Sequence, residues 1–404
     1  MGTKRNQSAT ASRVTLLSLC FGLLATGQVK ATTFSYSKIA DTNDTFTSFA
    51  FGNGPAINNE GAVAFLASIE ALELYPYSSP DYGIFTGGRT TTTIIPNTLG
   101  NVSVMGGITN EGMVVFEPFQ PNRNLVASDG TNTKTIIDLS NSPFTYLGQS
   151  LSNDLGTVAF VGIMSGQPGQ EPRGIFTSDG TKTTTILPTD NSWEIFSINA
   201  INNRGIVAFT TQKREGQRSI FLSDGTITSK IAATGDNFKS LGNASLNDLG
   251  KIAFFASLTD GNAGIFTSDG ITISNVVDLN SSPFESLGGG IINNEDTVVF
   301  FARLAEGDSG IYIGADPTND KVIAAGDELF DSKVQFVDFS NLGFNDIGQV
   351  AFRALLEDGT DGIYVATPEL SAQKESIAEP TSALAIVGFG VLVAGEVLKR
   401  QQRL

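Results

Sequence analysis

Residues 247–270, NDLGKIAFFASLTDGNAGIFTSDG, hold two short apolar runs separated and bounded by turn residues. The front half reads Asn, two residues, Gly, two residues, a small or β-branched residue, and Phe. Asn and Gly readily adopt the backbone conformations of tight turns, and such turns between short β-branched and aromatic runs are typical of antiparallel hairpins. The stretch therefore predicts a turn, a strand, a loop, a second strand and a second turn.

This front half recurs along the chain. The complete copies are Asn58, Gly61, Ala64, Phe65; Asn153, Gly156, Ala159, Phe160; Asn202, Gly205, Ala208, Phe209; Asn247, Gly250, Ala253, Phe254; and Asn345, Gly348, Ala351, Phe352. Two degenerate copies are Thr109, Gly112, Val115, Phe116, and Asn293, Asp296, Val299, Phe300. The motif phenylalanines are 51, 44, 49, 45, 46 and 52 residues apart, a period typical of propellers, solenoids and other repeat arrays. We interpret the Asn and Gly as turn residues and the Phe as core.

Each period holds four strand-like runs, and the two ends of the array complement one another. Residues 34–39 resemble the fourth run of a unit but precede the first copy, whereas the last copy stops after its third run at residues 362–366. A strand from the N-terminus that completes the last unit would close the array into a ring. The sequence therefore predicts an all-β fold, a seven-bladed β-propeller over residues 32–367, with eight blades or an open array as alternatives.

Composition within the unit predicts where each strand lies. Runs rich in Gly, Ser and Asn (residues 148–150, 240–245 and 287–290) suit the crowded axis, and the Thr-rich runs (residues 90–95, 131–137 and 181–187) suit the outer edge. The repeated Asn-x-x-Gly and Ser-Asp-Gly turns then fall on one face of the disc. The variable loops fall on the other face, where function on rigid scaffolds is concentrated.

The N-terminal residues 1–31 read as a secretory signal peptide. Positive charges precede an uncharged apolar run at residues 14–25. Val29, Lys30 and Ala31 place small residues at the positions that a signal peptidase reads, with cleavage after Ala31. Cys20 lies within the apolar run behind Leu19, so a lipid-anchor interpretation is the weaker alternative. Removal of the signal takes away the only cysteine, and stability must come from a large core.

The C-terminal residues have a different composition. Residues 368–377 form a polar linker, and residues 378–404 contain Glu379, Pro380, Thr381 and Ser382, an apolar stretch at 383–395 and a basic end. This order resembles the PEP-CTERM sorting signal of Gram-negative bacteria, although Ala378 stands where that family has its first Pro. The resemblance implies a transmembrane sorting helix and recognition by an exosortase.

The tandem repeats resemble those of bacterial choice-of-anchor proteins with the NxxGxxAF motif. The resemblance covers residues 57–352 and implies an exported protein with an interchangeable anchor. The expected location is the cell surface, outer envelope or extracellular matrix, with a C-terminal membrane anchor before processing. The expected partners are an exosortase-like sorting protease, the membrane through the tail, and an extracellular polysaccharide or surface protein.

Charge and composition exclude several function classes. The formal net charge is −16, or −20 once the four positive residues of the signal are removed, so nucleic-acid binding is not expected. The chain has no His and a single Cys, which excludes Ser-His-Asp and Cys-His catalysis and His- or thiolate-ligated metal sites. Carboxylate chemistry remains possible, and no cofactor is predicted apart from a possible Ca²⁺.

Two groups of side chains on the variable face are candidates for a site. The carboxylates, which could form a Ca²⁺ site or a glycosidase pair, are Asp41, Asp44, Asp138, Asp236, Asp278, Asp327, Glu328 and Asp331. The aromatic residues, which could stack on sugar rings, are Tyr75, Tyr77, Tyr82, Phe144, Trp193 and Phe284. We expect a non-catalytic binding or adhesion module, with a carboxylate-dependent polysaccharide hydrolase or lyase as the alternative.

Overall fold

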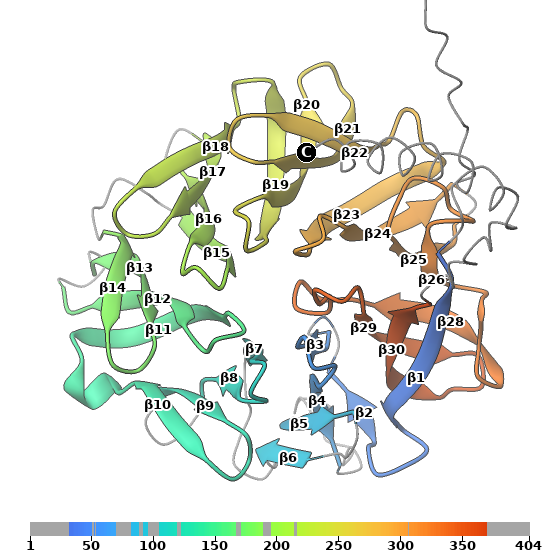
Figure 1. Ribbon diagram of the computed structural model, residues 1–404, viewed down its shortest axis with the longest axis horizontal. Coiled ribbons are helices and arrows are strands. Elements are labelled where there is room, and N and C mark those ends of the chain that lie inside the picture. Colours follow the sequence, from blue (N-terminus) through green and yellow to red (C-terminus); the bar gives the residue numbers. More distant parts are fainter. Residues whose placement is uncertain are drawn as a thin grey trace, which may run out of the picture. The chain divides into compact units, whose positions relative to one another are not determined.

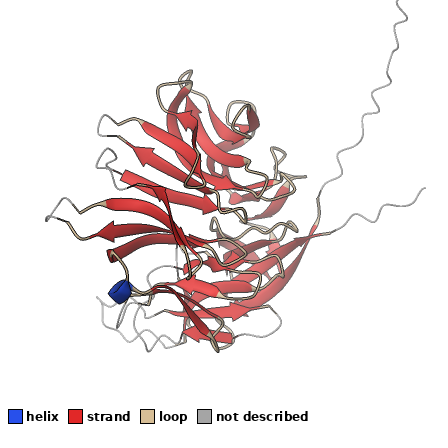
Figure 2. Ribbon diagram, turned by 60° about the vertical axis from the view of Figure 1, so that its left-hand side comes forward, coloured by secondary structure: helices blue, strands red, loops and turns tan. Residues whose placement is uncertain are grey.

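The repeats fold into seven antiparallel sheets arranged around a central axis (Figure 1). The computed structural model describes residues 32–369 except 51, 53, 70–81, 89–91, 96–104, 119–122, 167–170, 189–194, 214–215 and 306. Within these residues the only helical element is a single 3-10 turn, η2 (Leu139–Asn141) (Figure 2). The fold is therefore an all-β, seven-bladed propeller, and the eight-bladed and open alternatives are wrong.

The first four blades follow one another along the chain, and the strands of each blade are given from the innermost to the outermost. Blade 1 comprises β2 (Ser48–Phe49), β3 (Ala56–Ile57), β4 (Val63–Ser68), β5 (Gly83–Gly87) and β6 (Thr92–Ile95). Blade 2 comprises β7 (Met105–Ile108), β8 (Val114–Phe116), β9 (Leu125–Ser128) and β10 (Thr133–Ile137). Blade 3 comprises β11 (Phe144–Ser152), β12 (Val158–Met164), β13 (Arg173–Ser178) and β14 (Thr183–Leu187). Blade 4 comprises β15 (Ile195–Ile201), β16 (Val207–Gln212), β17 (Arg218–Ser223) and β18 (Thr228–Ala233).

The remaining three blades include the one that joins the two ends of the array. Blade 5 comprises β19 (Phe238–Leu246), β20 (Ile252–Leu258), β21 (Ala263–Ser268) and β22 (Ile273–Asp278). Blade 6 comprises β23 (Phe284–Ile292), β24 (Val298–Leu304), β25 (Ser309–Tyr312) and β26 (Lys321–Ala324). Blade 7 comprises β28 (Ser332–Asp338), β29 (Val350–Leu356), β30 (Asp361–Pro368) and β1 (Phe34–Asp41), with the short β27 (Glu328–Leu329) paired to β28.

The N-terminal strand closes the ring as predicted. β1 runs antiparallel to β30, from the pair Phe34 and Pro368 to the pair Asp41 and Gly362, with one irregularity in register. Figure 1 shows the two strands side by side although they come from opposite ends of the described chain. The Thr-rich strands β6, β10 and β14 lie at the outer edges of their sheets, which confirms the predicted order of strands within a blade.

The motif glycines occupy a backbone conformation that other residues rarely adopt. At the Asn-x-x-Gly turns, φ lies between 76° and 89°, for example 76° at Gly205 and 89° at Gly250. In the sixth repeat Asp296 adopts a φ of 61°, and Asp tolerates this region better than most side chains. Its carboxylate also accepts hydrogen bonds from Asn247 and Lys251, both at 3.1 Å, which link the sixth repeat to the fifth.

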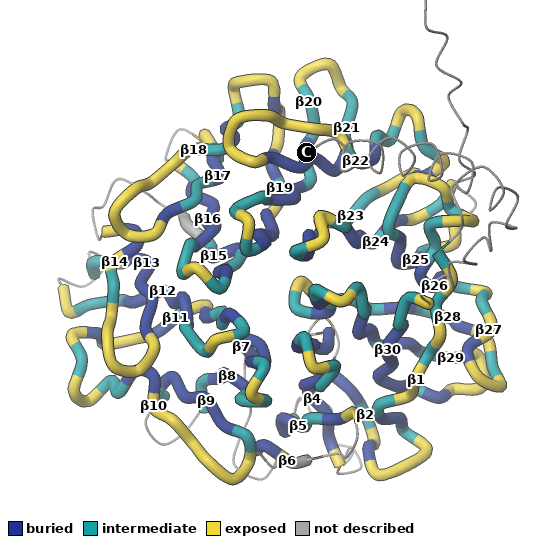
Figure 3. The backbone as a smooth tube through the Cα atoms, viewed as in Figure 1, coloured by how far each residue is buried: buried dark blue, intermediate teal, exposed yellow. Residues whose placement is uncertain are grey.

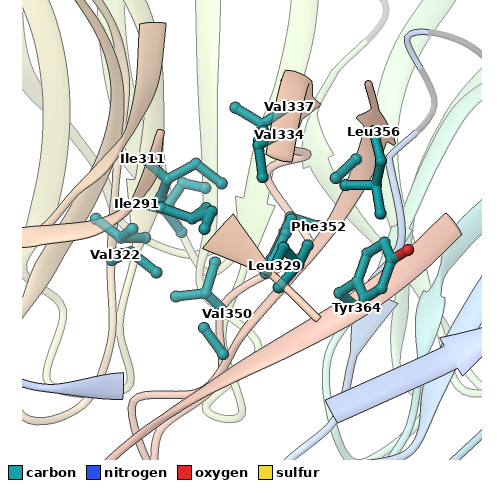
Figure 4. Packing of buried hydrophobic residues seen from close by; sticks show 14 residues of the cluster. Ile291, Ile311, Val322, Leu329, Val334, Val337, Val350, Phe352, Leu356 and Tyr364 are labelled. Atoms are coloured by element: carbon teal, nitrogen blue, oxygen red, sulfur yellow. The ribbon is translucent and has the colours of Figure 1, made fainter. Parts of the chain in front are cut away.

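In six blades the motif phenylalanine packs in the core against an aromatic residue of the third strand, and in blade 2 Phe116 lies opposite Val126. Phe160 stacks on Phe176 at a ring-centroid distance of 5.8 Å, and Phe300 stacks on Tyr312 at 6.3 Å. Between blades 6 and 7, Phe352 and Tyr364 join a cluster of branched aliphatic residues from both sheets (Figure 4). Figure 3 shows buried residues through the middle of the sheets and exposed residues along the outermost strands and turns. The hydrophobic core is therefore divided into repeating layers between blades.

The Ser-Asp-Gly turns lie on the same face as the Asn-x-x-Gly turns, because strands that alternate in direction bring the first and third hairpins of each sheet to one end. We call this end the turn face and the opposite end the loop face. In blade 4, the Asp224 carboxylate accepts hydrogen bonds from the backbone amides of Thr226 and Ile227 at 2.7 and 2.8 Å. These hydrogen bonds lower the pKa of Asp224 to about 2. The largest contribution to this shift comes from the hydrogen bond that the Thr226 hydroxyl donates.

Acid should weaken the propeller through these turns. The pKa of Asp129, Asp179 and Asp269 is also lowered by hydrogen bonds within their turns. A carboxylate with a depressed pKa contributes stability above its ordinary pKa of 3.8, and this contribution is lost as the pH falls through the folded-state value. We expect the melting temperature to fall progressively below about pH 4. In Asp224→Asn the fall should be shallower, since Asn does not titrate; identical pH profiles for the two proteins would contradict this.

Candidate functional site: the axial channel and its ring

The six motif asparagines each join their own blade to the next one. Their Nδ2 atoms donate to the main-chain carbonyl of the following motif residue: Asn58 to Thr109 at 2.8 Å, Asn153 to Asn202 at 2.9 Å, Asn202 to Asn247 at 3.0 Å, Asn247 to Asn293 at 3.1 Å, Asn293 to Asn345 at 3.4 Å, and Asn345 to Asn58 at 2.9 Å. The last bond links the seventh repeat to the first. The sequence predicted a turn role for these asparagines, and their Oδ1 atoms do accept hydrogen bonds from backbone amides of their own turns. The bond from Nδ2 to the next blade was not predicted.

A second set of hydrogen bonds around the axis involves the residue that follows the motif Asn or Thr. This residue is Asn or Asp in every repeat: Asn59, Asn110, Asp154, Asn203, Asp248, Asn294 and Asp346. Six of these side chains form a closed ring, in which each amide nitrogen donates to the Oδ2 atoms of two carboxylates. The distances are 3.0 and 2.9 Å from Asn203 to Asp154 and Asp248, 2.8 and 2.9 Å from Asn294 to Asp248 and Asp346, and 2.8 and 3.1 Å from Asn59 to Asp346 and Asp154. We call this the axial ring.

The second repeat is bypassed by the axial ring. Its motif residue, Thr109, also lacks the side-chain amide that makes the interblade bond in the other repeats, and its hydroxyl accepts a hydrogen bond from the backbone amide of Met113 at 3.1 Å. The backbone amide of Asn110 donates to the carbonyl of Asp154 at 3.0 Å, and Asn59 reaches past Asn110 to the Asp154 carboxylate. The degenerate second repeat therefore remains tied to its neighbours through the backbone.

Two of the ring carboxylates act on the third, Asp154. Burial raises the pKa of Asp154 above its ordinary value; the hydrogen bond from Asn203 opposes this shift, and the charges of Asp346 and Asp248 add to it. The ring thus concentrates negative charge at the axis on the turn face. The pattern that marks it, an Asn or Asp at the second position of all seven motifs, was visible in the sequence but had no assigned role.

A channel of about 200 Å³ lies against the axial ring along the central axis. It is lined by the innermost strands, and the residues along it include Gln149, Leu151, Asn243, Ile291 and Asn341. Because the ring lies on the turn face, the channel opens toward the loop face. Its walls combine side-chain amides with aliphatic groups, a composition that can hydrogen-bond hydroxyl groups and pack against C–H surfaces.

The eight predicted carboxylates do not assemble at this channel. Asp41 is buried, and it accepts from the Lys38 ammonium at 2.7 Å and the Asn43 backbone at 3.1 Å. Asp138, Asp278 and Asp327 accept backbone amides of their own turns, and Asp44 lies 4.0 Å from Lys38. Asp236, Glu328 and Asp331 are exposed. The carboxylates with described contacts therefore stabilise turns and strand ends.

Three of the six predicted aromatic residues are described by the structure, and all three are buried or partly buried. Phe144 and Phe284 are buried in the cores of blades 3 and 6, with ring centroids 4.8 Å from Phe176 and Tyr312 respectively. As the first residues of innermost strands, they point into their blades, and their expected stacking on sugars is wrong. Tyr82 is partly buried against the core between blades 1 and 2. Tyr75, Tyr77 and Trp193 lie outside the described residues.

One carboxyl group outside the predicted set has an unusual environment. Glu117 follows β8 toward the loop face, and burial raises its pKa to about 7 despite the opposing charge of Arg123. The Arg123 guanidinium lies 5.7 Å from the centroid of the Tyr146 ring. A carboxyl group that retains its proton near neutral pH can act as a general acid, which makes Glu117 a candidate for carboxylate chemistry.

Other expected features fall outside the described residues or have no site within them. Among residues that the structure describes, no three His, Cys, Asp or Glu side chains are placed to hold a metal ion. No helix in the same part of the chain is long and apolar enough to cross a bilayer. The signal peptide at residues 1–31, most of the linker, and the sorting tail at residues 378–404 are not described.

Comparisons with known proteins identify the fold. No family model and no curated protein matches the chain. An oligogalacturonate lyase from Vibrio parahaemolyticus has a similar structure, with a TM-score of 0.51, 12% identity, and coverage of 83% of this chain and 97% of that one. Another oligogalacturonate lyase structure, in complex with manganese, has a TM-score of 0.49 at 12% identity, covering 84% of this chain and 97% of that one. At this level of identity the likeness supports the propeller fold alone.

Proposed function

We propose that this chain is an exported propeller, held at the cell surface or in the extracellular matrix, that binds a polymer or surface protein without acting on it. The signal-like and sorting-like termini support export and anchoring. An exosortase-like protease would process the tail, and the tail would hold the chain in the membrane before processing. Mass spectrometry of both termini after cell fractionation tests this placement: a cytosolic chain with residues 1–31 intact would contradict it.

The observation that carries the binding function is the axial channel. It is held in a rigid ring by hydrogen bonds between blades, opens toward the variable loops, and presents amide groups beside aliphatic ones. Preformed concave sites with a few placed polar groups are the usual form of a ligand-binding pocket. Binding at such a site requires no titrating residue in the channel.

We expect saturable binding to extracellular glycans without turnover. The purified full-length chain would be applied to a glycan array with and without Ca²⁺, and bound glycans would then be incubated with the protein and analysed for shorter products. Binding without shortening supports the proposal. The comparison with and without Ca²⁺ tests whether a cation contributes.

The alternative, a carboxylate-dependent polysaccharide hydrolase or lyase, is favoured by Glu117. If glycans are shortened, Glu117→Gln should lower the rate by at least about 100-fold, because Gln cannot transfer a proton. Glu285→Gln provides a control, since Glu285 is an exposed carboxylate 3.6 Å from Arg303. Turnover that depends on Glu117 would replace the binding function with the enzymatic one.

A further inference from the structure

The axial ring closes the channel at the turn face, so the channel is open only at the loop face. Around the ring, successive amide nitrogens and carboxylate oxygens are 2.8 to 3.1 Å apart. The centre of a regular six-membered ring with such edges lies about 3 Å from every atom, which is contact distance for a single water or ion. A polymer cannot thread through the disc. Only the end of a chain can enter, from the loop face.

The walls carry polar groups at one repeated position. Four residues before the motif Asn, blades 3, 5 and 7 place the exposed amide side chains of Gln149, Asn243 and Asn341 along the channel, and blade 6 has the exposed Gly289 at this position. The Gln149 amide is held by the backbone of Ile198, to which it donates at 2.7 Å and from which it accepts at 3.0 Å. The wall therefore presents amide groups in the same layer of three blades, and that of Gln149 is held in place.

One of these amides is also oriented by a cation. The Oδ1 atom of Asn243 accepts a hydrogen bond from the Arg218 guanidinium at 3.0 Å, which leaves the amide nitrogen of Asn243 as a donor. Leu151, Ile291 and Phe344 supply apolar surface along the same channel. A sugar ring can bind to such a wall, because its hydroxyl oxygens accept hydrogen bonds from the amide donors and its C–H groups pack on the apolar side chains.

The charge at the blind end has one sign. Among the described residues that line the channel, the charged ones are the ring carboxylates Asp154, Asp248 and Asp346. Their hydrogen bonds to the ring amides hold them in place, so they cannot move away from an incoming anion. A uronate that entered the channel would meet three negative charges in a setting with less screening than bulk water.

We propose that the axial channel binds the end of a neutral, hydroxyl-rich polysaccharide chain and rejects polyuronates. This inference rests on the proposed binding function, and it adds the class of ligand and an end-on mode of binding. It also separates this chain from the substrate named for the structurally similar oligogalacturonate lyase, because the ring carboxylates repel such a chain.

The test uses probes of equal length and a variant that fills the channel. Gly289 occupies the strand position that Gln149 and Asn243 occupy along the channel, and a β-carbon added there meets no atom within 4 Å. We therefore expect Gly289→Trp to direct an indole into the channel with little disturbance of the strand. Asn275→Trp, at an exposed position of the outermost strand of blade 5, is the matched control. Affinities for linear hexamers of β-1,4-glucose, α-1,4-glucose, β-1,4-N-acetylglucosamine and galacturonate would be measured by calorimetry, with melting temperatures to confirm folding.

We expect at least one neutral hexamer to bind the unmodified chain and the Asn275→Trp control equally. Hexagalacturonate should bind at least about tenfold more weakly, and Gly289→Trp should lower the neutral affinity at least about tenfold. Neutral binding that survives Gly289→Trp, or hexagalacturonate binding of equal strength, would overturn the channel inference and leave the proposed function intact. Failure of every hexamer to bind, together with an empty glycan array, would overturn both.

Discussion

Phe254→Ala is expected to lower the free energy of unfolding by about 3–5 kcal/mol, because it removes a fully buried ring and leaves a cavity in the core. Phe254 is 0% exposed, and its ring centroid lies 5.8 Å from Phe238 and 6.0 Å from Phe266. The cluster around it also includes Ala208 and Ile220 of blade 4, so the cavity would open between two blades. Chemical denaturation followed by circular dichroism measures the change.

Leu249→Ala is the control for this prediction. Leu249 belongs to the same repeat but is 70% exposed at the tip of its turn, and its truncation should change stability by no more than about 0.5 kcal/mol. A loss below about 1 kcal/mol for Phe254→Ala would mean that the blades can close over the cavity, and that the motif Phe is not the main packing element of its blade.

Removal of residues 32–43 is expected to destabilise the propeller by about 5 kcal/mol or more, because it takes away the outermost strand of blade 7. The deletion exposes one edge of β30 and uncovers Ile363 and Val365, which pack with Ala40 in the core between blades 7 and 1. It also removes the hydrogen bond from the Tyr36 hydroxyl to the carbonyl of Val322 in blade 6. Thermal unfolding of chains that begin at Thr32 and at Asp44 gives the comparison.

A peptide of residues 32–43 added in trans should restore part of the lost stability, since it can pair with the free edge of β30. A peptide with the same composition in scrambled order should not, because the register from Phe34 to Asp41 would be lost. Equal melting temperatures for the two chains would show that the other blades hold the ring closed without β1, and that the interblade hydrogen bonds of the motif asparagines are sufficient.

Several features of the fold could be predicted because they depend on local chemistry and periodicity. The Asn-x-x-Gly and Ser-Asp-Gly turns are specified by residues that lie next to one another, and the seven-fold recurrence of the motif sets the number of blades. The spare run at residues 34–39 and the missing fourth strand after β30 predicted their pairing. Strand order followed from composition, since the crowded axis favours small residues and the outer edge accepts Thr.

The axial ring and the true environment of the candidate side chains depended on tertiary structure. Neighbouring residues of the ring are 45 to 95 positions apart along the chain, or 287 where the last repeat meets the first. Asn203 meets Asp154 and Asp248 only after three blades have converged on the axis. The repeat, the closing strand and the turns follow from the amino-acid sequence alone, because each is encoded within one unit or at the two ends. The folded chain was needed to show that Phe144 and Phe284 are buried, that Asp41 is paired with Lys38, and that the channel ends at three carboxylates. These outcomes depend on distances between units, and periodicity does not contain that information.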